Sequence, residues 1–373
     1  MKPNNPFLIS GYYSPELFCD RETETERILN ALRNERNITL ISPRRMGKTG
    51  LIKQAFYFLE KENGCITIYL DIFATQNLKE FVQLLGANIL GALDSNLEKI
   101  ISKVGGILKS CKPVISFDEI SGQPQIGLDI SAGQEQTGLK EIFEYIANSK
   151  KRCVIAIDEF QQIAKYPEKG VEALLRSYVQ FIPNVHFIFA GSKQHIMQEM
   201  FLSAKRPFFQ STQIMAVGSI EPNAYYEFAN LHLRKKNIYL TKETFLQIYN
   251  DFEGHTWYLQ AILNRIYSYD TSPADSVFVN KIIAELTEEG IFAYQNLIEA
   301  YTVNAIKLLK AISKEGYVAE INASSFLSKY DLGAASSVNT SLKRLLEREV
   351  IYKSEKGYIV YDRFMALWLR RQP

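Results

Sequence analysis

The residues best suited to phosphate chemistry form one short segment, Ser42-Pro43-Arg44-Arg45-Met46-Gly47-Lys48-Thr49. This segment follows an apolar run and opens a helical pattern that starts at Gly50, which is the context of a Walker A phosphate loop. In such a loop, backbone N–H groups cradle phosphate oxygens, and a glycine at the position of Gly47 lets the backbone approach closely. Lys48 is expected to reach the β- and γ-phosphates from a solvent-facing cradle, and the Thr49 hydroxyl to bind Mg²⁺. Ser42 stands where the usual pattern has its first glycine, and a serine can still make a tight turn.

Two adjacent carboxylates, Asp158 and Glu159, end an apolar run about 110 residues after the loop. Alone, such a pair is usually part of a solvated loop, but together with a Walker A loop it predicts a Walker B motif. Asp158 is then expected to hold Mg²⁺ through water, and Glu159 to orient and deprotonate the attacking water. The glutamate favours hydrolysis over a small-molecule kinase reaction, because a kinase must keep water away.

Three more polar residues are candidates for this site. Ser192 ends the next apolar run and could sense the γ-phosphate or the lytic water, with Lys193 as a second candidate. Both are also compatible with a turn that ends a strand. Arg206 could act as an arginine finger within or between subunits, or could simply be a solvated loop arginine.

The elements that position these residues alternate between strands and helices. Five short apolar runs predict strands buried on both faces: 38–41, 66–73, 153–157, 186–190 and 214–217. Helical patterns such as 50–61 and 170–181 lie between most of them, so the sequence predicts an α/β fold with a parallel sheet. We expect a P-loop domain over residues 1–220, with an inserted helix and hairpin at about 94–135.

The strand signal stops after Ile220, and the pattern becomes helical. Residues 221–300 predict a helical lid domain, and residues 301–373 a winged helix-turn-helix whose third helix runs from 334 to 348. Residues 301–373 carry twelve basic and seven acidic residues, a net charge of +5. Lys343, Arg344 and Arg348 lie on the third helix, where they could contact DNA or form a wet charged face.

Composition limits the remaining classes. The chain has 373 residues, 43 of them basic and 41 acidic, and 46% are hydrophobic, as in a globular protein of two or three domains. No apolar run approaches the roughly 18 residues that cross a bilayer, and the start lacks a signal-peptide pattern, so we expect a cytoplasmic protein without a membrane partner. The four cysteines and four histidines have no metal-ligand spacing, and the cysteines are expected to be buried free thiols.

Taken together, these motifs resemble the AAA+ superclass, in particular its STAND-type signalling ATPases from bacteria and archaea. The opening Phe18-Cys19-Asp20-Arg21-Glu22-Thr23-Glu24 looks like the family's F-x-x-R-E-x-E segment, which lies next to the adenine, so Phe18 and Arg21 become nucleotide-site candidates. Gly254-His255-Thr256-Trp257 stands at the family's G-x-P lid motif without its proline, and makes His255 a candidate phosphate contact. The resemblance implies the sheet order 5-1-4-3-2, with the Walker B strand beside the sensor strand, and a winged helix after the lid.

The leading hypothesis is therefore an ATPase switch that uses ATP/ADP and Mg²⁺. In it, nucleotide state controls how the lid and winged helix pack, and hence an interaction with a protein partner or a second copy. The alternative is a DNA-binding regulator in which nucleotide gates the winged helix. A GTP switch is disfavoured, because no N-K-x-D guanine-reading motif follows the sensor strand.

Overall fold

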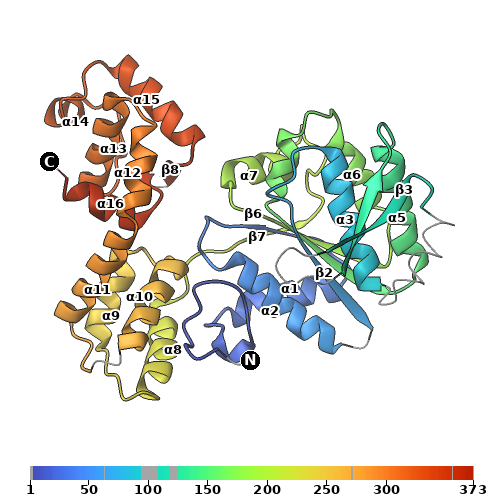
Figure 1. Cartoon of the computed structure of the whole chain (residues 1–373), viewed down its shortest axis with the longest axis horizontal. Coiled ribbons are helices and arrows are strands. Elements are labelled where there is room, and N and C mark those ends of the chain that lie inside the picture. The colour runs from blue at the N-terminus through green and yellow to red at the C-terminus, as the bar shows by residue number, and fades with distance from the viewer. Residues whose placement is uncertain are drawn as a thin grey trace. The chain divides into compact units, whose positions relative to one another are not determined.

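The computed structural model describes residues 3–62, 64–93, 108–117, 124–269, 272–354 and 356–372. They form two compact units (Figure 1). The first unit is Ser10–Tyr225, and the second combines Pro3–Ile9 with Tyr226–Pro373. No helix in the described ranges combines the length and apolar character needed to cross a bilayer.

A parallel sheet of five strands forms the centre of the first unit, in the order β2-β5-β6-β1-β7. In chain order the strands are β1 (Ile38–Ile41), β2 (Cys65–Asp71), β5 (Arg152–Asp158), β6 (Val185–Gly191) and β7 (Gln213–Ala216). Numbered one to five along the chain and read from β7, the order is 5-1-4-3-2, which confirms the prediction. Strand β5, which ends in the predicted Walker B pair, lies beside β6, with Val154 opposite His186.

Helices cover both faces of this sheet (Figure 1). One face carries α1 (Glu22–Arg33) and α2 (Lys48–Lys61). The other carries α3 (Leu78–Leu93), α5 (Glu135–Asn148), α6 (Val171–Val179) and α7 (Gln194–Leu202). Neighbouring residues of one strand serve opposite cores: Val154 packs toward α1 and α2, and Ile155 toward α3 and α5. Burial on both faces explains why the inner strands β1, β5 and β6 read as continuous apolar runs. The edge strands β2 and β7, also expected to be buried on both faces, are only partly buried.

An antiparallel hairpin is inserted between α3 and α5. Its strands β3 (Cys111–Phe117) and β4 (Pro124–Ile130) pair with Cys111 opposite Ile130. Leu128 and Ile130 join the core beneath α3 and α5. The turn of the predicted hairpin, and the part of the predicted insertion that directly follows Leu93, lie outside the described residues.

The second unit contains the predicted helical segment and the winged helix. Its first part comprises α8 (Pro222–Arg234, which begins in the first unit), α9 (Lys242–Asp251), α10 (Thr256–Tyr269), α11 (Ser276–Glu289) and α12 (Ile291–Glu299). Its second part comprises α13 (Val303–Glu315), α14 (Ser324–Lys329), α15 (Ala335–Glu347), the hairpin β8 (Ile351–Ser354) and β9 (Gly357–Val360), and α16 (Arg363–Arg370). Three helices followed by a ribbon form the expected winged helix, and α16 is an additional helix in its core.

The two parts of the second unit are joined by a mixed aromatic and ionic contact. Arg363, at the start of α16, pairs with Glu253 after α9 and donates to the Tyr352 hydroxyl at 3.1 Å. Its backbone N–H donates to the Tyr258 hydroxyl at 3.0 Å, and the Phe364 ring packs edge-on against Tyr258. This largely buried contact holds the helical segment and the winged helix together.

The first residues of the chain also belong to the second unit. Phe7 is fully buried, with its ring packed edge-on against those of Phe228, His232 and Tyr267. The Asn264 side chain donates to the Phe7 carbonyl at 2.7 Å, and the Asn5 side chain donates to the Asn264 carbonyl at 2.9 Å. Because Ser10–Tyr225 form the first unit, the chain passes between the units twice.

Candidate functional site

The phosphate loop connects β1 to α2. Ser42 is fully buried, and its backbone N–H donates to the Gly191 carbonyl at 3.4 Å, which ties the start of the loop to β6. Gly47 caps α2 in the left-handed conformation, with φ +84°. Only glycine adopts this conformation without strain, and the absent Cβ leaves the backbone accessible before the first free amides of the helix.

Phe18 closes one side of this helix start. A Cβ added at Gly50 would lie 2.8 Å from the Phe18 ring, so the ring and the helix backbone are in close contact. The Tyr12 ring meets Phe18 edge-on, and the Tyr12 hydroxyl donates to Gln54 Oε1 at 2.6 Å. The opening segment of the first unit is thus packed onto α2.

Lys48 does not face solvent, which corrects the sequence-based expectation. Its side chain is only 8% exposed, and its Nζ lies 3.0 Å from Asp158 Oδ1 and 3.3 Å from Glu159 Oε1. The lysine is buried because the sheet brings the end of β5 directly beside the start of α2. Without a ligand, its charge therefore compensates two carboxylates, and an anion that binds Lys48 must compete with them.

Asp158 is more enclosed than Lys48 and Glu159, with its side chain 4% exposed. Its Oδ2 accepts from the Thr49 hydroxyl at 2.8 Å and from the Tyr69 hydroxyl at 2.9 Å. Burial alone would raise the pKa of Asp158, but the charge of Lys48 and the hydrogen bonds from Lys48, Thr49 and Tyr69 outweigh it and hold this pKa below its ordinary value.

Glu159 is held on its other side by residues from two elements. Its Oε2 accepts from the Ser192 hydroxyl at 2.8 Å and from Gln161 Nε2. Ser192 accepts in turn from Arg44 Nε at 3.3 Å, so a phosphate-loop arginine reaches the end of β6. The structure thus brings together Arg44, Lys48, Thr49, Asp158, Glu159 and Ser192.

Sequence reasoning missed three members of this group. Tyr69 and Gln161 contact the two Walker B carboxylates directly, and Asp71 ends β2 in register with Asp158. Burial raises the pKa of Asp71, and the charges of Asp158 and Glu159 add to the rise. Its position at the end of a predicted strand beside Walker B was a usable signal, whereas Tyr69 and Gln161 gave none without the register.

Three other predicted residues have different surroundings. Arg21 is buried, and its guanidinium donates to the Met46 carbonyl at 3.1 Å and to the Gly218 carbonyl at 2.6 Å, so it braces the phosphate loop through the backbone. Arg206 pairs with Glu172, and lies 3.4 Å from Glu199. It lines a pocket of about 330 Å³.

His255 belongs to the second unit, where it precedes α10 and its ring packs against Tyr258. Its part in a nucleotide site stays a prediction.

The donors at the loop fit a magnesium–nucleotide complex. The Gly47 backbone and the start of α2 provide a cradle for phosphates, and Lys48 provides the charge. The Thr49 and Asp158 oxygens lie 2.8 Å apart, as two neighbouring hard oxygen donors. Among the described residues, no cluster of three or more His, Cys, Asp or Glu could hold a metal alone. A cation here would thus also need phosphate and water ligands, as Mg²⁺ usually does.

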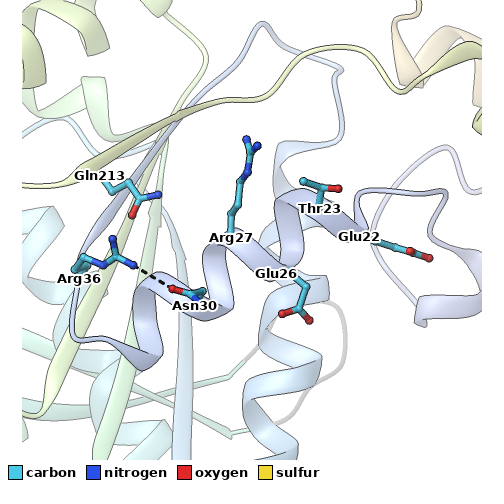
Figure 2. A pocket seen from close by; sticks show the side chains of 7 residues that line it. All are labelled: Glu22, Thr23, Glu26, Arg27, Asn30, Arg36 and Gln213. Atoms are coloured by element: carbon cyan, nitrogen blue, oxygen red, sulfur yellow. Dashed lines mark hydrogen bonds between the residues drawn. The ribbon is translucent and has the colours of Figure 1, made fainter.

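A separate pocket of about 520 Å³ lies along the outer side of α1 and the edge strand β7 (Figure 2). It is lined by Glu22, Thr23, Glu26, Arg27, Asn30, Arg36 and Gln213. The lining contains both acidic and basic side chains, and the Arg36 guanidinium donates a hydrogen bond to the Asn30 side chain at 3.1 Å. The pocket contains none of the predicted site residues.

Two protein-family models match parts of this chain. A family model described as "ATPase domain predominantly from Archaea" matches residues 18–262, and a model described as "Probable winged helix domain" matches residues 292–371. Comparison with curated protein sequences gave no match.

Among solved structures, the Walker-type ATPase PABY2304 of Pyrococcus abyssi is similar with a TM-score of 0.65 and 17% identity, over 98% of this chain and 99% of that protein. The ORC2 protein of Aeropyrum pernix, in its ADPNP-ADP complexes, gives a TM-score of 0.60 and 15% identity, over 99% of this chain and 96% of that one. At such low identity these likenesses speak for the fold alone. The family match, however, spans more than half of the chain. The chain therefore belongs to the family of ATPase domains found predominantly in Archaea, as a P-loop ATPase of the AAA+ type that also carries a winged helix.

Proposed function

We propose that this protein binds ATP with Mg²⁺, hydrolyses it to ADP and phosphate, and uses the nucleotide state as a switch. The observation that carries the proposal is a connected set of contacts at the end of the sheet. Lys48 lies within hydrogen-bond distance of Asp158 and Glu159, and Thr49 donates to Asp158. A phosphate cradle next to a carboxylate that can accept a proton is the arrangement hydrolysis requires.

Each residue has a distinct role in this proposal. Lys48 binds the β- and γ-phosphates, for which it must exchange at least one of its carboxylate partners. Thr49 and Asp158 hold Mg²⁺, which when bound neutralises charge on the phosphate oxygens. Glu159 orients water and takes its proton, and Ser192 contacts the γ-phosphate or that water.

The adenine side of the site is proposed at Phe18 and Arg21. Phe18 lies against α2 at Gly50, and Arg21 supports the loop at Met46. Both contacts link the opening segment to the phosphate cradle. We expect ATP to bind more tightly than GTP, because no guanine-reading side chains are apparent, and competition titration measures the difference.

The switch is proposed to move the second unit as one body. The helical segment and winged helix share the Arg363–Glu253 pair and the Tyr258–Phe364 contact, so separating them would expose a buried charge and aromatic surface. Changes in nucleotide state would then alter how this body is held on the ATPase domain, with His255 as its candidate phosphate contact. The resemblance to STAND ATPases implies only that nucleotide state changes how the lid and winged helix pack, and movement as one body is inferred from the Arg363 and Tyr258 contacts.

Glu159→Gln tests the hydrolytic mechanism. Glutamine keeps the size of the side chain but cannot take a proton, so turnover should fall by roughly 10²–10⁴-fold while ATP binding persists. Asp158→Asn should weaken metal and nucleotide binding as well. Glu60→Gln, a glutamate near the far end of α2, is the matched control and should leave turnover unchanged. Wild-type turnover in Glu159→Gln would show that this residue is not the base.

The same variant tests the switch. With ATP bound and hydrolysis blocked, it should differ from the ADP state in protease cleavage over residues 220–300. Identical cleavage patterns in the two states would leave an ATPase that does not switch.

Arg206 is the weakest member of the proposed catalytic set. Its guanidinium forms an ion pair with Glu172, and burial raises the pKa of Glu172. The test mixes Arg206→Ala subunits with Glu159→Gln subunits and measures turnover. Turnover that depends on protein concentration would show that Arg206 acts on a neighbouring subunit. Unchanged turnover would remove it from the reaction.

DNA binding through the winged helix is a second candidate. Its support is the exposed side of α15, where Lys343 is 79% exposed and Asn339 and Thr340 also face solvent. Arg344 and Arg348, by contrast, lie over the Tyr301 ring at 5.9 and 5.5 Å. Neutralising all three basic residues should lower the salt slope of binding by up to about three units if each contacts a phosphate. An unchanged slope would assign them to packing.

A further inference from the structure

We infer that Gln161 is a positioning residue for hydrolysis, which holds the Glu159 carboxylate so that its Oε1 alone is presented to the attacking water. The inference rests on the proposed function and goes beyond it, because neither the Walker motifs nor the family matches give Gln161 a role. Three observations carry it: the enclosure of the side chain, its bond to Glu159, and the use of both carboxylate oxygens.

The Gln161 side chain is enclosed in a slot beside the end of β6. The residue is 3% exposed, and it lies on the short 3-10 helix Phe160–Lys165 that follows Glu159. A Cβ added at Gly191 would lie 2.3 Å from Gln161 Oε1, so the slot exists because residue 191 has no side chain. Gln161 therefore has little freedom to rotate away.

The amide must present its nitrogen to Glu159. A carboxylate only accepts hydrogen bonds, so Gln161 Nε2 is the donor to Glu159 Oε2. The other amide atom, Oε1, is buried and has no hydrogen-bond partner among the described residues. Leaving a buried amide oxygen without a hydrogen bond costs stability, and such unsatisfied groups are common in functional sites. Here the arrangement directs the amide nitrogen at the carboxylate.

The two oxygens of Glu159 are thereby made different. Oε2 receives two donors, Gln161 Nε2 from the 3-10 helix and the hydroxyl of Ser192, which directly follows β6. Oε1 faces Lys48 at 3.3 Å, on the side of the phosphate cradle. Once Lys48 turns to phosphate, Oε1 is the oxygen free to accept the proton of water.

The backbone makes such a clamp necessary. Glu159 has a left-handed backbone conformation, with φ +56°, and its N–H donates to Asp158 Oδ1 at 2.9 Å. The side chain thus leaves the chain at a sharp turn, and side-chain donors are needed to fix its direction. The Ser192 hydroxyl alone would leave the carboxylate free to rotate about that single hydrogen bond, whereas Gln161 adds a second point of attachment.

Gln161→Met tests the inference, because methionine fills a similar volume without the donor. We expect kcat to fall by about 10-fold to 10²-fold, the cost of misplacing a reacting group by about 1 Å, with KM and the affinity for a fluorescent ATP analogue unchanged. Gln161→Glu should lose at least as much, since a second carboxylate repels the first. Gln162→Met is the matched control, because the Gln162 amide donates instead to the Thr75 carbonyl, at 2.9 Å, and its kcat should stay at the wild-type level.

A double variant separates positioning from general damage. In a Glu159→Gln background the group to be positioned is already inactive, so adding Gln161→Met should lower the residual turnover by less than twofold. A further 10-fold loss there, or wild-type kcat in Gln161→Met alone, would overturn the inference. Wild-type turnover in Glu159→Gln would instead refute the hydrolytic mechanism itself, so the two failures are distinguishable.

Discussion

Replacing Lys48 by alanine should destabilise the nucleotide-free protein as well as abolish nucleotide binding. The variant leaves the Asp158 carboxylate, whose side chain is 4% exposed, without its cation. Glu159 also loses its cation, but at 15% exposure it can turn toward water at lower cost. The destabilisation therefore comes mainly from one buried, uncompensated charge.

The expected loss is about 3 kcal/mol in the free energy of unfolding at pH 7, the lower end of the roughly 3–5 kcal/mol for breaking a buried pair. The lower end applies because the Thr49 and Tyr69 hydroxyls still donate to Asp158 Oδ2. They solvate the charge in part but do not neutralise it.

The loss should depend on pH in a defined direction. In the wild type the pKa of Asp158 is lowered, so this group adds stability above its unfolded pKa of about 3.9, which is lost as pH falls through the folded pKa. In Lys48→Ala burial acts without the opposing lysine and raises the pKa of Asp158, so the penalty exists only where the carboxylate is charged. The gap between wild type and variant should shrink from pH 7 to pH 4, by about 1.4 kcal/mol for each unit of upward shift.

Urea unfolding followed by far-ultraviolet circular dichroism measures this gap. Both tryptophans of the chain, Trp257 and Trp368, lie in the second unit, so their fluorescence reports the unit that the substitution does not touch. Asp158→Asn added to Lys48→Ala should restore most of the lost stability, because it removes the unpaired charge. Equal stability of Lys48→Ala and wild type at pH 7, or no recovery in the double variant, would refute the reasoning.

Three further substitutions have defined outcomes. Gly50→Ala should cost about 1–3 kcal/mol of unfolding free energy, because its Cβ would lie 2.8 Å from the Phe18 ring, and Phe18→Ala should remove that cost in urea titrations. Phe7→Ala should cost about 3–5 kcal/mol in the second unit, seen as a lower urea midpoint by tryptophan fluorescence, while ATP affinity stays unchanged. Arg363→Met should lower the same midpoint through loss of its partner Glu253, and an unchanged midpoint would show that the helical segment and the winged helix do not support each other through this pair.

The fold was predictable because its signals are local. The three inner strands β1, β5 and β6 are buried on both faces, and runs such as Val154–Ile157 therefore stand out from the sequence. The Walker motifs supplied the resemblance from which the strand order followed. The winged helix could be predicted because a helix such as α15 has a strong amphipathic pattern, and because Lys356-Gly357 marks the turn of the ribbon.

The missed features depend on contacts across the sheet. Tyr69 reaches Asp158 only because β2 pairs with β5 in the observed register, and no property of residue 69 alone indicates it. The burial of Lys48 likewise depends on β5 lying beside the start of α2. The contact of Gln161 with Glu159 could not be predicted either, because it depends on the slot at Gly191, a residue 30 positions away in the sequence.

The placement of Pro3–Ile9 has a consequence for how the protein is made. Asn5 and Asn264 are 259 residues apart in the chain, so residues 3–9 are synthesised long before their partners. The Ser10–Tyr225 unit is, in topological terms, an insertion into the other unit and can complete its fold first. Until α8 and α10 have been synthesised, Phe7 has no core to enter and stays exposed. A fragment that begins at residue 226 would lack this phenylalanine, and supplying residues 3–9 in trans or through a linker should be needed to close its core.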